Sequence, residues 1–364
     1  ISADAATGVM SSYNLVNGRP NTVSPDIGGT VRSWTDRDLF NVTDAGAPNN
    51  LTGSEAYFAT QAEADAAVLK AGLDSFTVDD TDPSKTIAAI NSALSQGLLT
   101  ESDVDAAVRH ILSIRFRLGD FDPDGGPYSG ITMDVVNSQE HQRLNRAVAG
   151  EAMVLLKNDA NTLPLDAAAN PKLAVVGPLA DTLYTDWYSG APPYRVTPLD
   201  GIRDRLGSGT TVTASEGVDR IALRAPDGTY VTAAAEGAPL RASGTSAATE
   251  QQFDTFDWGE NVLTLRAAVN GRFVSLGDER TLVNNADQPT GWFVQQQLKL
   301  VPHGDGVVIE YAGNDADDSW FGDQKYVVVG ADGTLTVGAA TLADATTFTT
   351  EVVTRGVDAA VAAA

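Results

Sequence analysis

Cysteine is absent from this 364-residue chain, and histidine occurs only three times. The absence of cysteine excludes a disulfide framework and a thiolate metal site. His110, His141 and His303 lie far apart in the sequence, and none has the spacing typical of metal ligands. Long apolar runs are also missing, because no stretch approaches the roughly 18 residues of a membrane helix. The sequence therefore predicts no histidine or thiolate metal site and no segment that spans a bilayer.

Positive charge is scarce, since 24 Lys and Arg residues stand against 48 Asp and Glu, for a formal net charge of −24. Such a chain repels phosphate backbones and anionic lipid surfaces. We therefore expect neither nucleic acid nor a membrane as a partner, whereas a neutral ligand such as a sugar fits. The composition, 43% hydrophobic and 20% charged, is typical of a globular protein, and 364 residues predict two or three domains.

The first third of the chain alternates short strand patterns with helical patterns. The predicted strands are Gly8–Tyr13, Leu39–Asp44 and Ser75–Val78, and the predicted helices are Ser54–Ala71, Pro83–Gln96 and Glu101–Leu118. Gly72 is a candidate C-cap, and Thr100 with Asp103 resembles a capping box. Strands that alternate with helices indicate βα units and a parallel sheet, in either a barrel or an open doubly wound form.

A linker rich in Pro, Gly and Asp, Asp120–Pro127, leads to a second α/β pattern. Its predicted elements are a helix over Ser138–Glu151 and a buried strand over Leu173–Gly177. The turn that follows reads Gly177-Pro178-Leu179-Ala180. It lacks the glycine spacing that lets a pyrophosphate approach the backbone, so the pattern does not indicate a dinucleotide site.

From Asp219 to Val353 the helical periods vanish, and short alternating segments are separated by Asp-Gly, Asn-Gly and Gly-Asp turns. Three similar units, 221–233, 263–276 and 324–337, each combine β segments with a tight glycine turn, which predicts a β-trefoil similar to fascin-like domains. Tyr230, Phe273 and Tyr326 recur at matching positions, and we assign them to the core. Residues 355–364 are expected to return to the α/β domain, which makes the trefoil an insertion.

Both ends of the chain are expected to be cuts through larger domains. Ile1–Thr7 is typical of the tail of a helix that runs directly into a strand, with no initiator Met before it. The other end stops in an alanine-rich helical stretch, Val357–Ala364.

Polar residues at the ends of the first two predicted strands are the first candidates for a site. Ser12-Tyr13-Asn14 and Thr43-Asp44 stand where strands give way to loops. In parallel βα architectures active sites form at these ends. An aspartate there can be a ligand, a base or a nucleophile, and it can also cap the next helix.

Several blocks, found in order over residues 8–217, resemble glycoside hydrolase family 3 in its β-glucosidase and β-xylosidase branch. The blocks are VMSSYNLVNGRP (9–20), LFNVTDAGA (39–47), AVLKAGLD (67–74), LTESDVDAAVRHILSIRFRLGDFDP (99–123), VLLKND (154–159), LPL (163–165), LAVVGPLAD (173–181) and WYSGAPPYRVTPLDGI (187–202). The first four are similar to the family's barrel, and the rest to its α/β sandwich domain.

The resemblance implies site residues. Asp44 aligns with the catalytic nucleophile, which attacks the anomeric carbon to give a glycosyl-enzyme that water hydrolyses. Tyr13 aligns with a pocket tyrosine. Ser189, Tyr188 and Trp187 fall where the second domain overhangs the pocket, and they are expected to bind substrate. The structural alternatives are a capping aspartate, a core tyrosine and an ordinary turn.

The sequence departs from the family at three points. Ala45 follows Asp44, where this branch often has Trp or Cys, so an aromatic face worth about 0.5–1.5 kcal/mol to a stacked sugar is missing. The family's Lys-His pair, with the upstream Asp and Arg that hold the sugar, is expected before Ile1. Its acid/base Glu is expected beyond Ala364.

The predicted architecture is multidomain α/β plus all-β. The segments are 1–119 (C-terminal part of a (β/α)8-like barrel), 120–136 (linker), 137–218 (α/β sandwich domain, first part), 219–353 (inserted fascin-like β-trefoil) and 354–364 (return to the sandwich domain). The acidic loop Asn314–Asp323 carries four aspartates that could bind Ca²⁺. A solvated loop is the simpler interpretation, and no metal site is predicted.

The predicted function is retaining exo-hydrolysis of terminal β-D-glucosyl or β-D-xylosyl residues, without a cofactor, with an oligosaccharide or glycoside as partner. Two alternatives stay open. One is a glycoside phosphorylase on the same scaffold, and the other is a non-enzymatic protein that binds carbohydrate through the trefoil. A homodimer is one option for the oligomeric state, and both a secreted and a cytoplasmic location fit the sequence.

Overall fold

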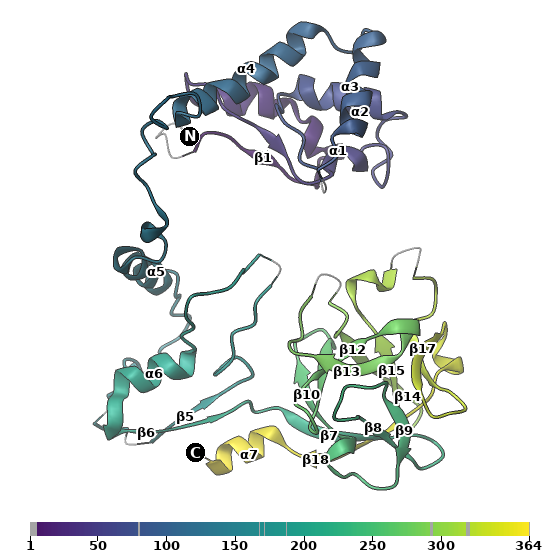
Figure 1. Cartoon of the computed structure of the whole chain (residues 1–364). Coiled ribbons are helices and arrows are strands. Elements are labelled where there is room, and N and C mark those ends of the chain that lie inside the picture. Colours follow the sequence, from purple (N-terminus) through teal and green to yellow (C-terminus); the bar gives the residue numbers. More distant parts are fainter. Residues whose placement is uncertain are drawn as a thin grey trace. The chain divides into compact units, whose positions relative to one another are not determined.

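A computed structural model describes most of the chain, in two compact units, Ile1–Ala152 and Met153–Ala364 (Figure 1). The described residues are 6–78, 81–166, 168–170, 172–186, 188–291, 294–317 and 321–363.

Two short parallel strands and one bridging residue organise the first unit. β4 (Val42–Thr43) pairs with β1 (Met10–Ser11) on one side, and Val42 forms a parallel bridge to Ser75 on the other. A small hairpin of β2 (Leu15–Val16) and β3 (Arg19–Pro20) follows β1. The predicted strands therefore form a parallel layer, but each is shorter than expected.

Helices cover the parallel layer of the first unit. They are α1 (Ala47–Asn50), α2 (Gln61–Ala71), α3 (Ser84–Ser95) and α4 (Glu101–Leu118). The capping box of Thr100 and Asp103 is present, and Gly72 ends α2 with φ of 101°. The predicted start of α2 at Ser54 was wrong, because a second capping box, Thr60 with Glu63, begins the helix at Gln61. Two apolar clusters, around Leu51 and around Leu99, pack α2 against its neighbours.

The segment after α4 is exposed. It contains a 3-10 turn at Met133–Val135 and then α5 (Gln139–Glu151), which Ser138 caps through the backbone N–H of His141. All of α5 lies in the described part of the chain, and none of its side chains is buried. The compact units divide after α5, at Ala152, whereas the sequence places a domain start at 137; the predicted domain boundaries stay predictions.

The second unit begins with a small α/β layer. β5 (Lys172–Val176) pairs in parallel with β6 (Thr211–Ser215), and α6 (Pro198–Leu206) lies between them in the sequence. The chain then enters an all-β segment and comes back through α7 (Gly356–Ala363), which contacts β6. The all-β segment is thus enclosed by elements of the α/β layer.

Twelve antiparallel strands, counted over the described residues, make up the all-β segment of residues 219–354 (green to yellow in Figure 1). They are β7 (Asp219–Arg224), β8 (Tyr230–Thr232), β9 (Arg241–Gly244), β10 (Gln252–Asp257), β11 (Leu263–Ala267), β12 (Phe273–Leu276), β13 (Leu282–Ala286), β14 (Leu298–His303), β15 (Gly306–Tyr311), β16 (Tyr326–Val329), β17 (Leu335–Ala339) and β18 (Thr349–Thr354).

Six of these strands form a closed ring. The pairing runs β18-β7-β10-β11-β14-β15, and a bridge from Val307 to Phe348 joins β15 back to the start of β18. The other six form three hairpins, β8-β9, β12-β13 and β16-β17, each continuing from a ring strand. Single bridges connect the hairpins to one another, as between Arg241 and Thr334.

The same turn chemistry recurs at three places in the all-β segment, between β7 and β8, between β11 and β12, and between β16 and β17. Asp227, Asn270 and Asp332 each accept a hydrogen bond from the backbone N–H two residues ahead, at 2.9, 3.0 and 3.0 Å. The glycine between has φ of 90°, 70° and 84°, a region that glycine adopts without strain. The repeated Asx-Gly pairs of the sequence therefore mark three turns of the same local geometry, two that lead from a ring strand into a hairpin and one inside the β16-β17 hairpin.

The core of the all-β segment is apolar and well buried. Its largest fully buried side chains are Leu223, Phe253, Leu265, Tyr311, Phe321 and Phe348. Of the three aromatics assigned to the core, Phe273 is 2% exposed, whereas Tyr230 and Tyr326 are only half-buried. Tyr230 instead donates a hydrogen bond from its hydroxyl to Glu351. Two further aromatics of this segment, Trp292 and Phe293, lie outside the described residues.

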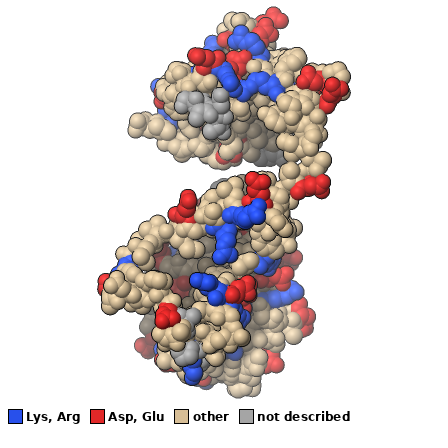
Figure 2. Space-filling view, turned by 90° about the vertical axis from the view of Figure 1, so that its left-hand side faces the viewer, with Lys and Arg blue, Asp and Glu red and all other residues tan. Residues whose placement is uncertain are grey.

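Two surface properties bear on the expected partners. No helix among the described residues combines the length and apolar character needed to cross a membrane. On the face shown in Figure 2, Lys and Arg side chains lie among Asp and Glu side chains.

Candidate active site

Asp44 lies directly after β4, the middle strand of the parallel layer. Its backbone N–H donates to the carbonyl oxygen of Ser11 at 3.0 Å, which extends the pairing of β1 and β4. On the other side, the backbone N–H of Thr77 donates to the Thr43 hydroxyl at 2.9 Å. These bonds fix Asp44 at the carboxyl edge of the parallel layer formed by β1, β4 and the bridge to Ser75, the edge at which βα folds place their active sites.

The Asp44 carboxylate is half-buried and has few partners. Oδ1 accepts a hydrogen bond from the backbone N–H of Ala45 at 2.8 Å, and the side chain makes no other hydrogen bond to a described residue. The next helix, α1, is capped by Gly46 without a side-chain bond. The carboxylate is therefore not a helix cap, and it keeps lone pairs for a ligand.

Tyr13 comes close to the same loop from the end of β1. Its hydroxyl donates to the carbonyl oxygen of Ala45 at 2.5 Å, and 46% of the residue is exposed. The structure thus brings Tyr13 to the backbone next to Asp44, and it contradicts the alternative of a core tyrosine. Tyr13 and Asp44 therefore both bond to the backbone of Ala45, and no direct hydrogen bond joins these two described residues.

The opposite edge of the layer carries a buried ionic cluster of Arg32, Asp74 and His110. Arg32 Nη2 lies 2.8 and 2.7 Å from the two oxygens of Asp74. His110 Nδ1 lies 2.7 Å from Asp74 Oδ1, and the backbone N–H of Asn41 donates to Oδ2 at 2.8 Å. The Asp74 side chain is 3% exposed, so water has little access to its carboxylate.

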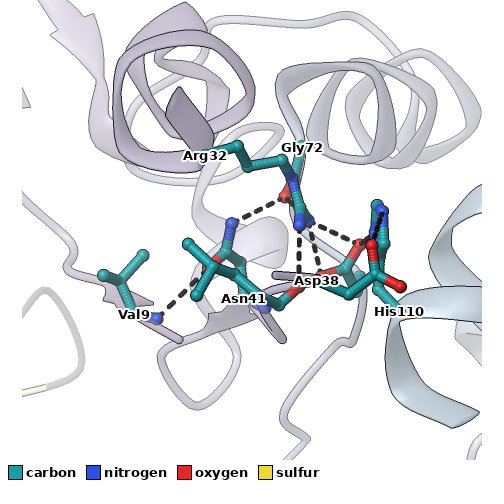
Figure 3. Close-up of polar contacts among 8 residues, drawn as sticks. Val9, Arg32, Asp38, Asn41, Gly72 and His110 are labelled. Carbon is teal, nitrogen blue, oxygen red and sulfur yellow. Dashed lines mark hydrogen bonds and ion pairs between the residues drawn. The ribbon is translucent and has the colours of Figure 1, made fainter. Parts of the chain in front are cut away.

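Arg32 also ties the cluster to the backbone (Figure 3). Its guanidinium donates to the carbonyl oxygens of Leu39 and Gly72 at 2.7 and 2.9 Å, and Asn41 donates to Gly72 at 3.2 Å. Figure 3 places His110 beside Asp38, and the nearest ring nitrogen and carboxylate oxygen are 4.0 Å apart. Asn41 precedes β4 and Asp74 precedes the bridging residue Ser75, so the cluster lies at the amino edge of the parallel layer.

Asp65 is a third carboxylate of this unit, on α2, and it is 1% exposed. Its Oδ1 accepts from Gln61 Nε2 at 2.7 Å, and it faces a cavity of about 30 Å³ that Gly46, Thr77 and Lys85 help to line. Burial raises the pKa of Asp65 to about 6, although the Gln61 hydrogen bond partly lowers it. No sequence pattern marks Asp65, because it lies inside an ordinary helical pattern.

Tyr188 and Ser189 belong to the loop between β5 and α6 in the second unit. The Ser189 hydroxyl donates to Asp186 Oδ1 at 2.6 Å, and the backbone N–H of Tyr188 donates to the same oxygen at 3.0 Å. The Ser189 hydrogen bond is the main cause that lowers the pKa of Asp186. Tyr188 is 85% exposed, so this is a tight polar turn with an outward tyrosine. Trp187, the third residue predicted here, lies outside the described residues.

The acidic loop near residue 315 does not form a cation site in the part of the chain that is described. Asp315 is fully buried and accepts a hydrogen bond from the Tyr311 hydroxyl, and Asp317 pairs with Lys325. No group of three or more potential metal ligands occurs among the described residues. Asp318 lies outside them.

Known proteins similar to this chain include some that are named as β-xylosidases and as a β-glucosidase. Probable beta-D-xylosidase 7 from Arabidopsis thaliana is 36% identical over 208 residues, 54% of this chain and 26% of the relative. Periplasmic beta-glucosidase from Salmonella typhimurium is 32% identical over 234 residues, 59% of this chain and 29% of the relative. The chain thus spans under a third of the length of these relatives.

A solved structure described as a β-glucosidase from Erythrobacter marinus matches with a TM-score of 0.50 and 27% identity, over 60% of this chain and 28% of the other. The family model described as glycosyl hydrolase family 3 C-terminal domain matches residues 153–363, more than half of the sequence. The chain therefore belongs to glycosyl hydrolase family 3.

Proposed function

We propose that the complete protein is a retaining exo-β-glycosidase that hydrolyses terminal non-reducing β-D-xylosyl or β-D-glucosyl residues through a glycosyl-enzyme on Asp44. Relatives named as β-D-xylosidases and as a β-glucosidase support this reaction class and both sugars. An oligosaccharide or another glycoside is the proposed substrate, and the reaction needs no cofactor.

The main support for the proposal is the environment of the Asp44 carboxylate. The side chain lies at the carboxyl edge of the parallel layer, is half-buried, and accepts one hydrogen bond from a described residue, the N–H of Ala45. A nucleophilic carboxylate needs a fixed position and an oxygen that is free to attack. Oδ2 of Asp44 meets this requirement, because no described residue donates to it.

The proposed reaction is a double displacement. Asp44 attacks the anomeric carbon, a bond from its oxygen to that carbon forms, and the glycosidic bond breaks with its electron pair on the leaving oxygen. A general acid protonates that oxygen, and water then hydrolyses the glycosyl ester with the same group as base. We assign the acid/base to no residue of this chain. The Tyr13 hydroxyl, held by Ala45, supports the loop that carries the nucleophile.

The proposed architecture has two finer features. The parallel pair β1-β4, its bridge to Ser75 and the helices that follow support the C-terminal part of a (β/α)8-like barrel in the first unit. The ring of six strands with three bridged hairpins supports a β-trefoil over residues 219–353. Its position between β6 and α7 supports an insertion into the α/β sandwich domain.

Replacement of Asp44 by Asn tests the nucleophile. In the complete protein Asp44→Asn should lower turnover of a β-xyloside and a β-glucoside by about three orders of magnitude or more, because an amide cannot form the glycosyl ester. The melting curve should stay close to that of the unchanged protein. Turnover within about tenfold of the unchanged protein would contradict the proposal.

The same assay separates a hydrolase from a glycoside phosphorylase. A hydrolase releases free sugar at the same rate with and without inorganic phosphate. Release of a sugar 1-phosphate, with turnover that depends on phosphate, would replace the proposed reaction by phosphorolysis.

A further inference from the structure

The loop between β5 and α6 is bonded to the all-β segment through Thr185. The backbone N–H of Thr185 donates to Gln288 Oε1 at 3.1 Å, and Gln288 Nε2 donates back to the carbonyl oxygen of Thr185 at 2.6 Å. The hydroxyl of Thr290 donates to the same carbonyl oxygen at 3.2 Å. Gln288 therefore satisfies both backbone groups of Thr185, as a neighbouring strand would.

Tyr184, the preceding residue, packs on the aromatic side chains of the all-β segment. Its ring lies edge-on to Phe273 and to Trp258, with ring centroids 6.3 and 6.4 Å apart. Phe273 is a core residue, only 2% exposed, and Tyr184 is half-buried against it. Aromatic pairs of this geometry are worth about 0.5–1.5 kcal/mol beyond the area that they bury.

The residues that follow Thr185 form the polar turn that contains Tyr188 and Ser189. Asp186 accepts hydrogen bonds from the Ser189 hydroxyl and the Tyr188 N–H, which hold the turn together. On its N-terminal side the turn follows directly on Tyr184 and Thr185. The position of Tyr188 and Ser189 is therefore set by the all-β segment as well as by the α/β layer from which the loop emerges.

These loop contacts are not needed to hold the all-β segment in place. At its two ends, Asp219 accepts hydrogen bonds from Arg355 Nη1 at 2.8 Å and from the N–H of Gly356 at 2.9 Å. Arg266 pairs with both Glu216 and Asp254 near the same point. Since the segment is already anchored where it joins the α/β layer, the bonds of Gln288 and Thr290 order the loop rather than the segment.

We propose that Gln288 and Thr290 are positioning residues, through which the all-β segment fixes Tyr184 and Thr185, and with them the turn of Asp186, Tyr188 and Ser189, and thereby sets the affinity for the glycoside. The inference rests on the proposed function and on the substrate-binding role that the family resemblance implies for Tyr188 and Ser189. It gives the inserted segment a role in glycoside recognition without direct contact between the segment and the sugar.

The test combines hydrogen exchange with steady-state kinetics on the complete protein. Gln288→Ala should speed amide exchange of Thr185 by about tenfold, because its hydrogen-bond acceptor is lost. The same variant should raise KM for an oligosaccharide by about three- to tenfold and change kcat by less than about twofold. Thr290→Val should act in the same direction, whereas Thr290→Ser keeps the hydroxyl and should behave as the unchanged protein.

Gln324→Ala is the matched control, since Gln324 is an exposed glutamine of the same segment that bonds to Arg280 and not to the loop. It should change neither the exchange of Thr185 nor KM. Unchanged exchange of Thr185 in Gln288→Ala would overturn the positioning role. Faster exchange with an unchanged KM would overturn the role in affinity. If the unchanged protein turns over no glycoside, the proposed function and the affinity role fail together, and exchange alone decides whether Gln288 orders the loop.

Discussion

Asp44 and Asp74 stand at opposite edges of one small parallel layer, and they differ in how fully their carboxylates are bonded. Asp74 lies beside three nitrogen atoms, of Arg32, Asn41 and His110, all within 2.8 Å. Asp44 accepts a single hydrogen bond, from Ala45, among the described residues. Asn41 and Asp44, one at each edge, are three residues apart along β4, so the two edges are roughly 10 Å apart at about 3.3 Å per residue.

This difference in hydrogen bonding fits two different roles, a structural one for Asp74 and a chemical one for Asp44. A carboxylate with all its lone pairs engaged by a partly exposed arginine, an imidazole and a backbone N–H is held in place. A carboxylate with one hydrogen bond is oriented and keeps an oxygen for a ligand. In the proposed function, the Asp74 edge therefore contributes stability and the Asp44 edge contributes the nucleophile.

Replacement of Asp74 should give the larger loss of stability. Asp74→Asn removes the charge opposite Arg32, which is 18% exposed, and turns an N–H toward the guanidinium. Loss of one partner from such a buried pair costs about 3–5 kcal/mol, so the free energy of unfolding of the complete protein should fall by about 3 kcal/mol. Urea unfolding followed by circular dichroism measures it.

Asp44→Asn is the matched control, because it makes the same chemical change at the other edge. It should shift the free energy of unfolding by less than about 1 kcal/mol. Equal losses of stability in Asp74→Asn and Asp44→Asn would contradict the predicted difference between the two edges.

Asp65 offers a third case for the comparison. Its carboxylate is buried, and among the described residues its hydrogen-bond partner is the neutral amide of Gln61. Its pKa is raised from 3.8 to about 6, so between about pH 4 and pH 6 the folded state binds more protons than the unfolded state. The free energy of unfolding therefore falls as pH rises through this window, by about 2–3 kcal/mol in total, and the cost is complete above pH 6.

Asp65→Asn should remove this cost, because the amide carries no charge and still accepts from Gln61. The variant should be more stable at pH 7 by about 1–3 kcal/mol and lose the slope between pH 4 and pH 6. Asp105→Asn, at an exposed position of α4, should change stability at pH 7 by less than about 0.5 kcal/mol. An Asp65→Asn protein that is less stable at pH 7 would contradict a buried, costly charge.

Much of the fold follows from local sequence signals. The capping box at Thr100, the glycine that ends α2 and the recurring Asx-Gly turns each act through neighbouring residues, and the structure has all of them. The start of α2 was misplaced because helical composition continues upstream of Thr60, whereas the capping box decides the boundary.

The site was predictable only in part. Asp44 and Tyr13 stand at strand ends, which a sequence shows, and the two meet at Ala45. The cluster around Asp74 depends on Arg32 and His110, 42 and 36 residues away, and no local pattern marks such pairs. The contact of Thr185 with Gln288 spans 103 residues and both segments of the second unit, so only a three-dimensional structure reveals it.

The identity of the carboxylate that forms the glycosyl-enzyme tests the central claim most directly. A 2-deoxy-2-fluoro β-glycoside with a dinitrophenyl leaving group forms the intermediate and slows its hydrolysis, so the ester accumulates on the nucleophile. Peptide mapping by mass spectrometry of the complete protein should then locate the sugar on Asp44, and Asp44→Asn should remain unlabelled. A sugar ester on any other carboxylate, Asp65 and Asp74 included, would contradict the assignment.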